Sequence, residues 1–166
     1  MGADKALLDL GGQTAVEWVV NACREGCVDP VIVVRAAGAM PLPSSLRART
    51  VVVSNSSAMI DSLRGGLAAL PTATAGCAGA LVFPVDYPLV SPATISSVVA
   101  ELLAGGDLVL PLYSERPGHP IGLAKGLFGE VMAVEGSLRD VVAADKARVR
   151  TVPVDGTVPE RRSSYF

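Results

Sequence analysis

Asp86 is the residue of this chain best placed for metal chemistry. It directly follows the apolar run Gly79–Val85 in the segment FPVDYPLVSP, and Pro88 fixes a turn just after it. In open α/β sheets, ligands bind beyond the carboxyl ends of the strands. A carboxylate there suits Mg²⁺, which combines one or two carboxylates with phosphate oxygens and water. The alternative is an Asp-x-Pro turn whose side chain caps backbone amides, and the residues alone leave both interpretations open.

Two further residues could take part in chemistry, and each also has an ordinary explanation. Lys5 precedes the first expected helix, where a lysine can meet phosphate, although an isolated lysine is usually only solvated. His119 is the sole histidine and lies in a Pro-Gly-His-Pro segment. It is either a donor in a substrate pocket or a loop residue shaped by its neighbours. Neither residue decides a function without further context.

Several classes of function are excluded by what the sequence lacks. It has no P-loop, no G-x-G-x-x-G after a strand, no G-x-S-x-G motif and no histidine pair for zinc. A hydrolase triad would need an activated serine beside the only histidine, and nothing indicates one. The 14 basic and 16 acidic residues are scattered, so we expect no nucleic-acid partner and no anionic membrane surface as partner. An anionic ligand must therefore be held locally.

The sequence also predicts where the protein works. Charged residues, proline and glycine interrupt every apolar run well before the ~20 residues that a membrane span requires. Asp4, Lys5 and Asp9 interrupt the only stretch that could serve as a signal peptide. We therefore expect a cytoplasmic protein whose three cysteines are buried free thiols.

The elements that must position these residues alternate between buried strands and amphipathic helices. Apolar, β-branched runs predict strands at Val31–Arg35, Thr50–Ser54, Gly79–Val85, Asp107–Tyr113 and Arg148–Val154. Helical spacing and capping residues predict helices at Thr14–Gly26, Met59–Leu70 and Ser91–Gly106, and shorter ones around Leu123–Val134 and Leu138–Ala144. This alternation predicts a three-layer α/β fold.

The length of 166 residues, half of them apolar, fits one domain, and a chain of this size can bury roughly 68–70% of its unfolded surface. We expect a single domain over residues 1–154 and a polar tail over residues 155–166. Its sheet should be mostly parallel and contain the first four predicted strands, with helices on both faces.

Four segments taken together resemble one enzyme family. They are MGADKALLDLGG, AMIDSLRGGLAAL, LVFPVDYPLVSPATI and RPGHPIGLAKGLF, in that order over most of the chain. This pattern is similar to the MobA-like nucleotidyltransferase family, and within it to the molybdenum cofactor cytidylyltransferase type. The resemblance implies a Rossmann-like domain of the nucleotide-diphospho-sugar-transferase type. Such a domain takes CTP or GTP with Mg²⁺ and transfers a nucleoside monophosphate, with CMP favoured, onto the phosphate of a molybdopterin-type cofactor, releasing pyrophosphate.

The resemblance also assigns roles at the phosphate end of the site. Asp86 matches the family's metal-binding aspartate. Gly2 and Lys5 match the end of its glycine-rich phosphate loop, with Lys5 near the nucleotide phosphates. Asp86 and Lys5 are thus the expected catalytic residues, a reasonable pair because nucleotidyl transfer is mostly positioning and charge neutralisation.

The remaining assignments concern the nucleoside and the acceptor. Ser62 and Leu63 fall in the segment that lies near the base and ribose. Gly118, His119 and Pro120 match the segment on the acceptor side of the cleft. All five roles are carried over from the family motifs.

The start of the chain departs from the family pattern. Family members place a strand and an Ala/Gly-rich loop before the residues that match Met1 and Gly2, so we expect this domain to be N-terminally incomplete. The sheet should then leave a gap between the strands at Val31–Arg35 and Gly79–Val85, or fill it from another chain. Two alternatives stay open: a truncated or non-catalytic relative, and a nucleotidyltransferase for another small phosphorylated acceptor.

Overall fold

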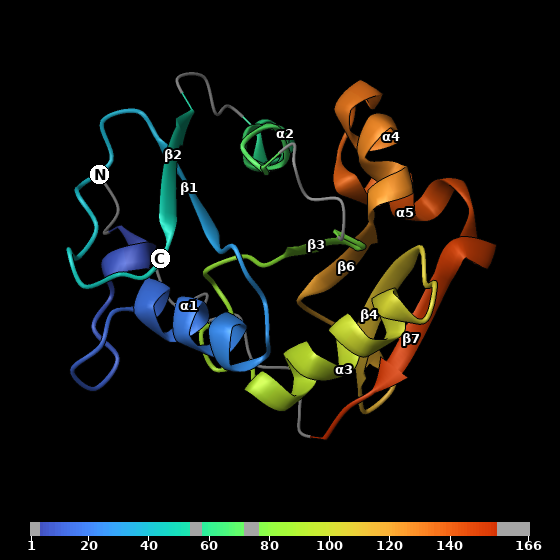
Figure 1. Cartoon of the computed structure of the whole chain (residues 1–166), viewed down its shortest axis with the longest axis horizontal. Helices are drawn as coiled ribbons and strands as arrows, with labels where there is room; N and C mark the ends of the chain where they lie inside the picture. The colour runs from blue at the N-terminus through green and yellow to red at the C-terminus, as the bar shows by residue number, and fades with distance from the viewer. Residues whose placement is uncertain (1–3, 54–57, 72–76, 156–166) are drawn as a thin grey trace.

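The structure, a computed structural model, describes residues 4–53, 58–71 and 77–155. It contains two sheets covered by helices (Figure 1). The helices are α1 (Ala15–Glu25), α2 (Met59–Ala68), α3 (Pro92–Leu103), α4 (Phe128–Ala133) and α5 (Leu138–Ala144), with 3₁₀ turns η1 (Lys5–Leu7), η2 (Lys125–Leu127) and η3 (Lys146–Arg148). The strands are β1 (Ile32–Ala36), β2 (Arg49–Val53), β3 (Gly79–Val82), β4 (Leu108–Tyr113), β5 (Arg116–Pro117), β6 (Ile121–Ala124) and β7 (Val149–Pro153).

Strand pairing is mixed in direction. In the smaller sheet β1 and β2 run parallel, with Ile32 opposite Arg49 and Ala36 opposite Val53. The larger sheet has the order β3-β6-β4-β5, and β7 also pairs with β4. The β4–β7 pair is parallel, whereas the β3–β6, β6–β4 and β4–β5 pairs are antiparallel. The predicted α/β class with helices on both faces is confirmed.

The expectation that the first four predicted strands share one sheet is wrong. Strands β1 and β2 form a sheet of their own, and β3 and β4 belong to the other, where β6 lies between them. Within the described residues no strand pairing joins β1 to β3. In this part of the chain the two strands are therefore unpaired with each other, and the gap between them stays a prediction.

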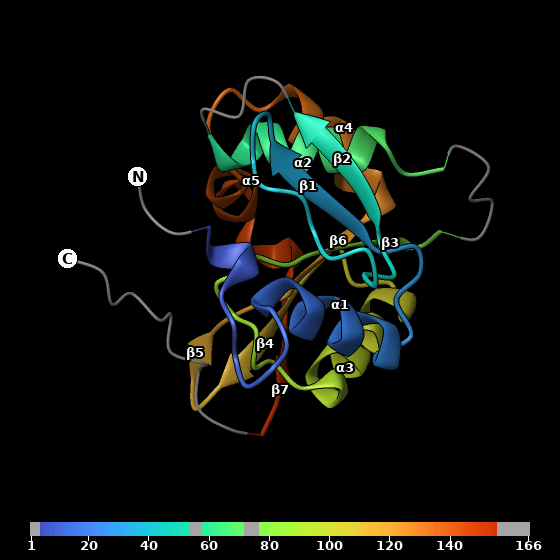
Figure 2. The same cartoon turned by 90° about the vertical axis from the view of Figure 1, so that its left-hand side faces the viewer.

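Alternate residues of β1 pack against different helices. Val33 contacts the cluster that contains Val16 and Val20 of α1. Its neighbour Val34 points to α2, where a Cβ added to Gly66 would lie 3.2 Å from its Cγ2. Helices α1 and α2 therefore cover opposite faces of the β1–β2 pair, as Figure 2 shows. This is why β1 is a continuous apolar run and not an alternating one.

The larger sheet is covered in the same way. On one face Val98 of α3 packs against Val109 of β4. On the other, Leu108 and Leu123 pack with Val131 of α4, and all three side chains are fully buried. Because Leu108 and Val109 are adjacent, they point to opposite faces of β4.

Helices connect the two sheets on both faces. On one, Ile60 of α2 belongs to the same cluster as Leu108 and Leu123 of the larger sheet. On the other, Cys23 of α1 packs with Ile95 of α3. In the described parts of the chain, the two sheets are held together by side-chain packing and not by hydrogen bonds between strands.

One predicted helix begins too early. The sequence places helix around Leu123–Val134, but Ile121–Ala124 form β6 and the helical turn starts at Lys125. The segment IGLA has no strand pattern of its own, because it is short and contains a glycine. Packing determines its conformation: a Cβ on Gly122 would lie 2.9 Å from both Leu102 and Val98. The two-residue strand β5 is likewise missing from the sequence prediction.

The helix starts follow the prediction, and the cysteines follow it in part. Ser91 Oγ accepts a hydrogen bond from Thr94 N (3.2 Å) at the start of α3, and Thr14 N donates to Glu17 Oε2 (2.8 Å) at the start of α1. All three cysteines are free, and burial raises the pKa of Cys23 to about 12. The expectation that all three are buried is wrong, because Cys27 lies exposed in the turn after α1 and Cys77 is only partly buried.

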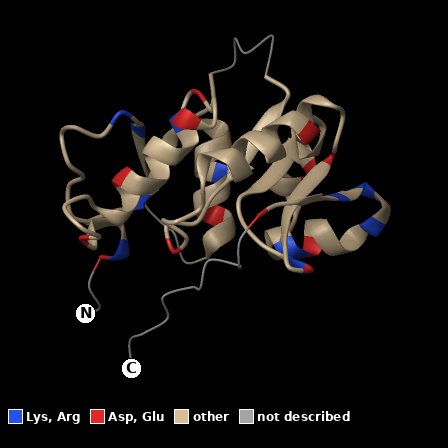
Figure 3. Cartoon of the chain, turned by 90° about the horizontal axis from the view of Figure 1, so that it is seen from below, with Lys and Arg blue, Asp and Glu red and all other residues tan. Residues whose placement is uncertain are grey.

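Charge is distributed without a dominant sign. Acidic and basic residues lie intermixed in the view of Figure 3. None of the helices within the described residues has the length and apolarity that a membrane crossing needs. The predicted tail lies outside the described residues except for Asp155, so the domain boundary at residue 154 stays a prediction.

The close approach of α3 to β6 can be tested with one added methyl group. We expect Gly122→Ala to lower the free energy of unfolding by about 1–3 kcal/mol, because the new Cβ overlaps Leu102 and Val98. The matched control is Gly129→Ala in α4, where a Cβ meets nothing within 4 Å. It should be neutral or stabilising by up to about 1 kcal/mol. Urea unfolding measures both, and equal stabilities would contradict the packing.

Candidate active site

The structure brings together the two residues that the sequence selects as catalytic. Lys5 Nζ lies 3.1 Å from Asp86 Oδ1. Strand β3 ends at Val82, three residues earlier than the predicted strand, and residues 83–85 lead from its carboxyl end to Asp86. The Asp86 side chain is 18% exposed and that of Lys5 is 58% exposed, so the carboxylate is held inside and the ammonium lies at the surface.

Lys5 belongs to a very short element that is fixed at its start and in its middle. It is the first residue of η1, and Asp4 caps this turn through a hydrogen bond from Ala6 N to Asp4 Oδ1 (3.2 Å). Ala6 is buried and packs in the cluster of Val16 and Val20. The turn therefore carries Lys5 on a backbone anchored to α1.

The predicted acceptor segment lies beside the residue that follows Asp86. The rings of Tyr87 and His119 are 4.7 Å apart between centroids and tilted by 36°. Tyr113 Oη donates a hydrogen bond to His119 O (3.0 Å), and burial raises the pKa of Tyr113, so this donor stays protonated. A Cβ on Gly118 would lie 2.7 Å from the Tyr113 ring. Pro120, joined to His119 by a cis peptide bond, is buried.

The predicted nucleoside residues lie on a different element. Ser62 and Leu63 are in the middle of α2, the helix that covers the other face of the β1–β2 pair from α1. Leu63 is partly buried against the core cluster of the larger sheet, which gives it a packing role. Their contact with base and ribose stays a prediction. Gly2 lies outside the described residues.

The surroundings of Asp86 fit a hard divalent cation bound with few protein ligands. Among the described residues there is no group of three or more His, Cys, Asp or Glu side chains that could enclose a metal ion. Mg²⁺ commonly binds one or two carboxylates and takes its other ligands from phosphate and water. Asp86 already has a cation, the Lys5 ammonium, at one of its oxygens.

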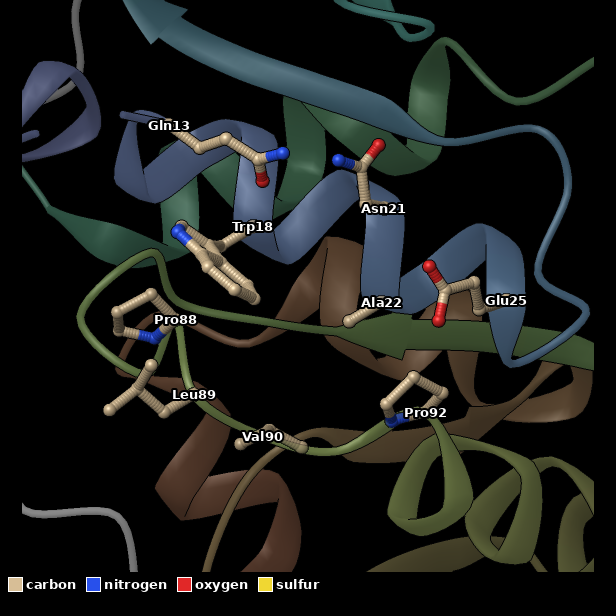
Figure 4. A pocket seen from close by; sticks show the side chains of 9 residues that line it. All are labelled: Gln13, Trp18, Asn21, Ala22, Glu25, Pro88, Leu89, Val90 and Pro92. Carbon is tan, nitrogen blue, oxygen red and sulfur yellow. The ribbon is translucent and has the colours of Figure 1, made fainter. Parts of the chain in front are cut away.

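The structure contains a cavity that sequence reasoning did not find. It has a volume of about 290 Å³ and lies between α1 and the segment that follows Asp86 (Figure 4). Trp18 and Ala22 form one wall, and Pro88, Leu89 and Pro92 form the other. Neither Lys5 nor Asp86 lines it. The only sequence signal is the tryptophan in an amphipathic helix, a pattern that core packing also produces.

Comparison with known proteins places this geometry in a family. The model of the MobA-like NTP transferase domain matches residues 1–150. The chain belongs to this family. The family is one of nucleotidyltransferases, so the protein is of an enzyme family, as its sequence predicts. A search of curated protein sequences gives no match.

Solved structures agree with this assignment. Rv0371c from Mycobacterium tuberculosis H37Rv is 25% identical, with a TM-score of 0.81 over 96% of this chain and 84% of that one. The same protein has also been solved in complex with manganese. The 2-C-methyl-D-erythritol 4-phosphate cytidylyltransferase from Thermus thermophilus is 21% identical, with a TM-score of 0.70 over 98% and 88% of the two chains.

A more distant solved structure is named for molybdopterin-guanine dinucleotide biosynthesis. The molybdopterin-guanine dinucleotide biosynthesis protein A from Archaeoglobus fulgidus is 16% identical, with a TM-score of 0.52 over 90% of this chain and 74% of that one. At this identity, and at that of the Thermus enzyme, the likeness concerns the fold alone.

The support of the His119 segment by Tyr113 can be tested directly. Tyr113→Phe removes the hydroxyl that donates to His119 O, and we expect a loss of about 1 kcal/mol in unfolding free energy. Because His119 is the sole histidine, its imidazole NMR signals are unambiguous and should shift. Tyr87→Phe is the control, since it keeps the ring beside His119. An unchanged His119 spectrum in Tyr113→Phe would show that this hydrogen bond does not hold the segment.

Proposed function

We propose that this protein transfers a nucleoside monophosphate, CMP in the first instance, from a nucleoside triphosphate to the phosphate of a molybdopterin-type cofactor. The observation that carries the proposal is the Lys5–Asp86 pair at the carboxyl end of β3. Family membership supports nucleotidyl transfer, and the motif resemblance supports the cofactor as acceptor. The free cysteines are consistent with a reducing compartment, the cytoplasm.

The reaction needs positioning more than it needs a covalent intermediate. An oxygen of the acceptor phosphate attacks the α-phosphorus of the nucleotide, the bond from the α-phosphorus to the bridging oxygen breaks, and pyrophosphate leaves. Asp86 would hold Mg²⁺, which supplies positive charge to the phosphates when bound. Lys5, more than half exposed on a flexible stem, can turn from Asp86 to a phosphate oxygen.

The acceptor would lie on the side of His119. The Gly118–Pro120 segment is fixed by Tyr113 and lies beside Tyr87, the residue after Asp86. This ring contact supports an acceptor surface next to the proposed metal ligand. The alternative is a phosphorylated acceptor of another type. A panel of acceptors distinguishes the two, because only a true acceptor causes the nucleoside triphosphate to release pyrophosphate.

A further strand belongs to this proposal. Strands β1 and β3 have no pairing with each other in the described residues, although helices cover the region between them on both faces. The family resemblance implies a strand at this place, followed by a glycine-rich loop whose amides would contact the triphosphate. What supports it here is the pair of open strand edges, which buried sheets rarely leave unsatisfied.

The metal assignment is tested by Asp86→Asn. We expect CTP or GTP to bind in the presence of Mg²⁺ or Mn²⁺, and the variant to lose transfer by roughly 100-fold or more, because it removes the ligand of the ion that neutralises the phosphates. Stability should change by less than about 1 kcal/mol, since the pair with Lys5 is partly exposed. Calorimetric titration and pyrophosphate release measure these effects.

The control for Asp86→Asn is Asp145→Asn, because Asp145 is in an ion pair with Arg148 (3.6 Å) outside the candidate site. It should leave nucleotide binding unchanged. Near-normal turnover by Asp86→Asn would remove the metal assignment. Absence of nucleotide binding by every form of the protein would instead favour a non-catalytic relative.

The strand proposal predicts a difference between two forms of the protein. A form extended upstream of Met1 by the strand and glycine-rich loop that the family resemblance implies should bind CTP much more tightly than the 166-residue chain. The physical reason is the set of backbone amides that the loop adds around the triphosphate. Titration and unfolding of both forms decide the matter, and equal affinity would show that no such segment is needed.

A further inference from the structure

Two consecutive residues of opposite charge, Asp4 and Lys5, have partners on two different sheets. Lys5 pairs with Asp86, which follows β3 of the larger sheet. Asp4 pairs with Arg35, which lies in β1 of the smaller sheet. The turn η1 is thus tied by one ion pair to each side of the region where β1 and β3 remain unpaired in the described residues.

The Asp4–Arg35 contact is the more constrained of the two pairs. Arg35 Nη1 donates to Asp4 Oδ1 (3.1 Å) and Nη2 donates to Asp4 Oδ2, so the contact is bidentate. The Arg35 side chain is only 11% exposed and that of Asp4 is 23% exposed. Hydrogen bonding from Arg35 holds the pKa of the Asp4 carboxyl below its usual range, which keeps it ionised at neutral pH. Bidentate arginine–carboxylate pairs fix geometry as well as adding energy.

Both partners of this pair are also bonded to backbone. Arg35 Nη2 donates to Met40 O (3.1 Å) in the segment after β1. Asp4 Oδ1 accepts from Ala6 N (3.2 Å), and Asp4 O accepts from Leu7 N (3.0 Å), which closes the turn around Lys5. A 3₁₀ turn of three residues has little stability of its own. Its position therefore depends on these contacts and on the burial of Ala6.

The Lys5–Asp86 ion pair fixes the position of its two side chains less well than the Asp4–Arg35 pair does. Lysine is a point charge on a flexible stem, and exposed ion pairs typically contribute only about 0–1 kcal/mol. The Lys5 side chain is 58% exposed, so packing contributes little to fixing its ammonium at Asp86. Whether the Lys5 ammonium reaches Asp86 therefore depends on where η1 places the Lys5 backbone.

We propose that Asp4 and Arg35 form a clamp that positions Lys5 on Asp86, which makes both of them positioning residues for the transfer reaction. Neither is placed among the groups that touch nucleotide or metal; each acts through the turn that carries Lys5. The geometric part, that the clamp sets the location of Lys5, stands on the contacts above. The kinetic part rests on the proposed function.

The geometric part is tested without any activity. The chain has three lysines, Lys5, Lys125 and Lys146, so reductive methylation with ¹³C gives few lysine methyl signals, and Lys5→Arg assigns that of Lys5. Asp86→Asn defines the position of this signal without the partner charge. We expect Arg35→Gln and Asp4→Asn to move the Lys5 signal most of the way to that position. Asp4→Asn retains an oxygen that can cap Ala6 N, so it separates loss of the ion pair from loss of the turn.

The chain provides a matched control for these variants. Arg148 and Glu130 form another bidentate pair, with Nη1–Oε2 at 2.7 Å and Nη2–Oε1 at 3.2 Å, between η3 and α4. Arg148→Gln should leave the Lys5 signal in place. A Lys5 signal that stays in place in both clamp variants, with thermal unfolding showing that they are folded, would overturn the clamp.

The kinetic part is tested by a double-mutant cycle with Lys5. We expect Arg35→Gln to lower kcat/KM for nucleotidyl transfer by about tenfold, and Arg35→Lys to recover part of the loss because it keeps the charge without the bidentate contact. In the Lys5→Ala background the same Arg35→Gln change should have almost no further effect. A purely structural role predicts the same loss in both backgrounds and would overturn the positioning role.

The two proposals fail in different ways. If the wild-type chain performs no transfer with any acceptor, the proposed function fails, while the Lys5 methyl signals still test the clamp. If the wild-type chain transfers nucleotide and the clamp variants equal it in rate and in Lys5 signal, the clamp fails and the proposed function stands.

Discussion

The structure depends on how its two sheets are held together, because β1 and β3 at their facing edges do not pair in the described residues. The hydrogen bonds from Arg49 N to Val31 O and from Ala37 N to Val53 O show that alternate residues of β1 bond to β2. The intervening residues therefore direct their backbone groups to the other edge of β1. In the described part of the chain that edge and the free edge of β3 have no strand between them. Helices on both faces, and the turn η1, hold the two sheets in place instead.

This arrangement explains where the candidate site lies. Arg35 stands near the carboxyl end of β1 and Asp86 just beyond the carboxyl end of β3. In open α/β sheets, ligands bind outside these ends, at the point where neighbouring strands diverge. The turn with Asp4 and Lys5 lies at that point and contacts both sides. The same contacts thus stabilise the junction between the sheets and gather the charged residues of the site.

The sequence predicts the parts of this structure that depend on local pattern. The helix caps at Thr14 and Ser91 and the position of Asp86 after an apolar run can all be derived from neighbouring residues. Features set by distant pairing could not be found in this way. Strand β6 is selected by packing beneath α3, and the division into two sheets depends on pairings between segments far apart in the chain. Arg35 lies 31 residues from Asp4 in sequence, and no motif connects them.

The charges at the junction set a limit on what the chain can bind unaided. Asp4, Lys5, Arg35 and Asp86 form two ion pairs whose charges cancel, so the site itself offers no net attraction to a triphosphate. In the proposed reaction Lys5 would turn to a phosphate and Asp86 would lose this ion pair, and a largely buried carboxylate beside a polyanion is unfavourable. A divalent cation at Asp86, as the proposed function requires, would remove this conflict, because it would compensate the carboxylate and leave positive charge for the nucleotide. On that proposal metal and nucleotide bind cooperatively, because the cation reduces the repulsion between the Asp86 carboxylate and the triphosphate.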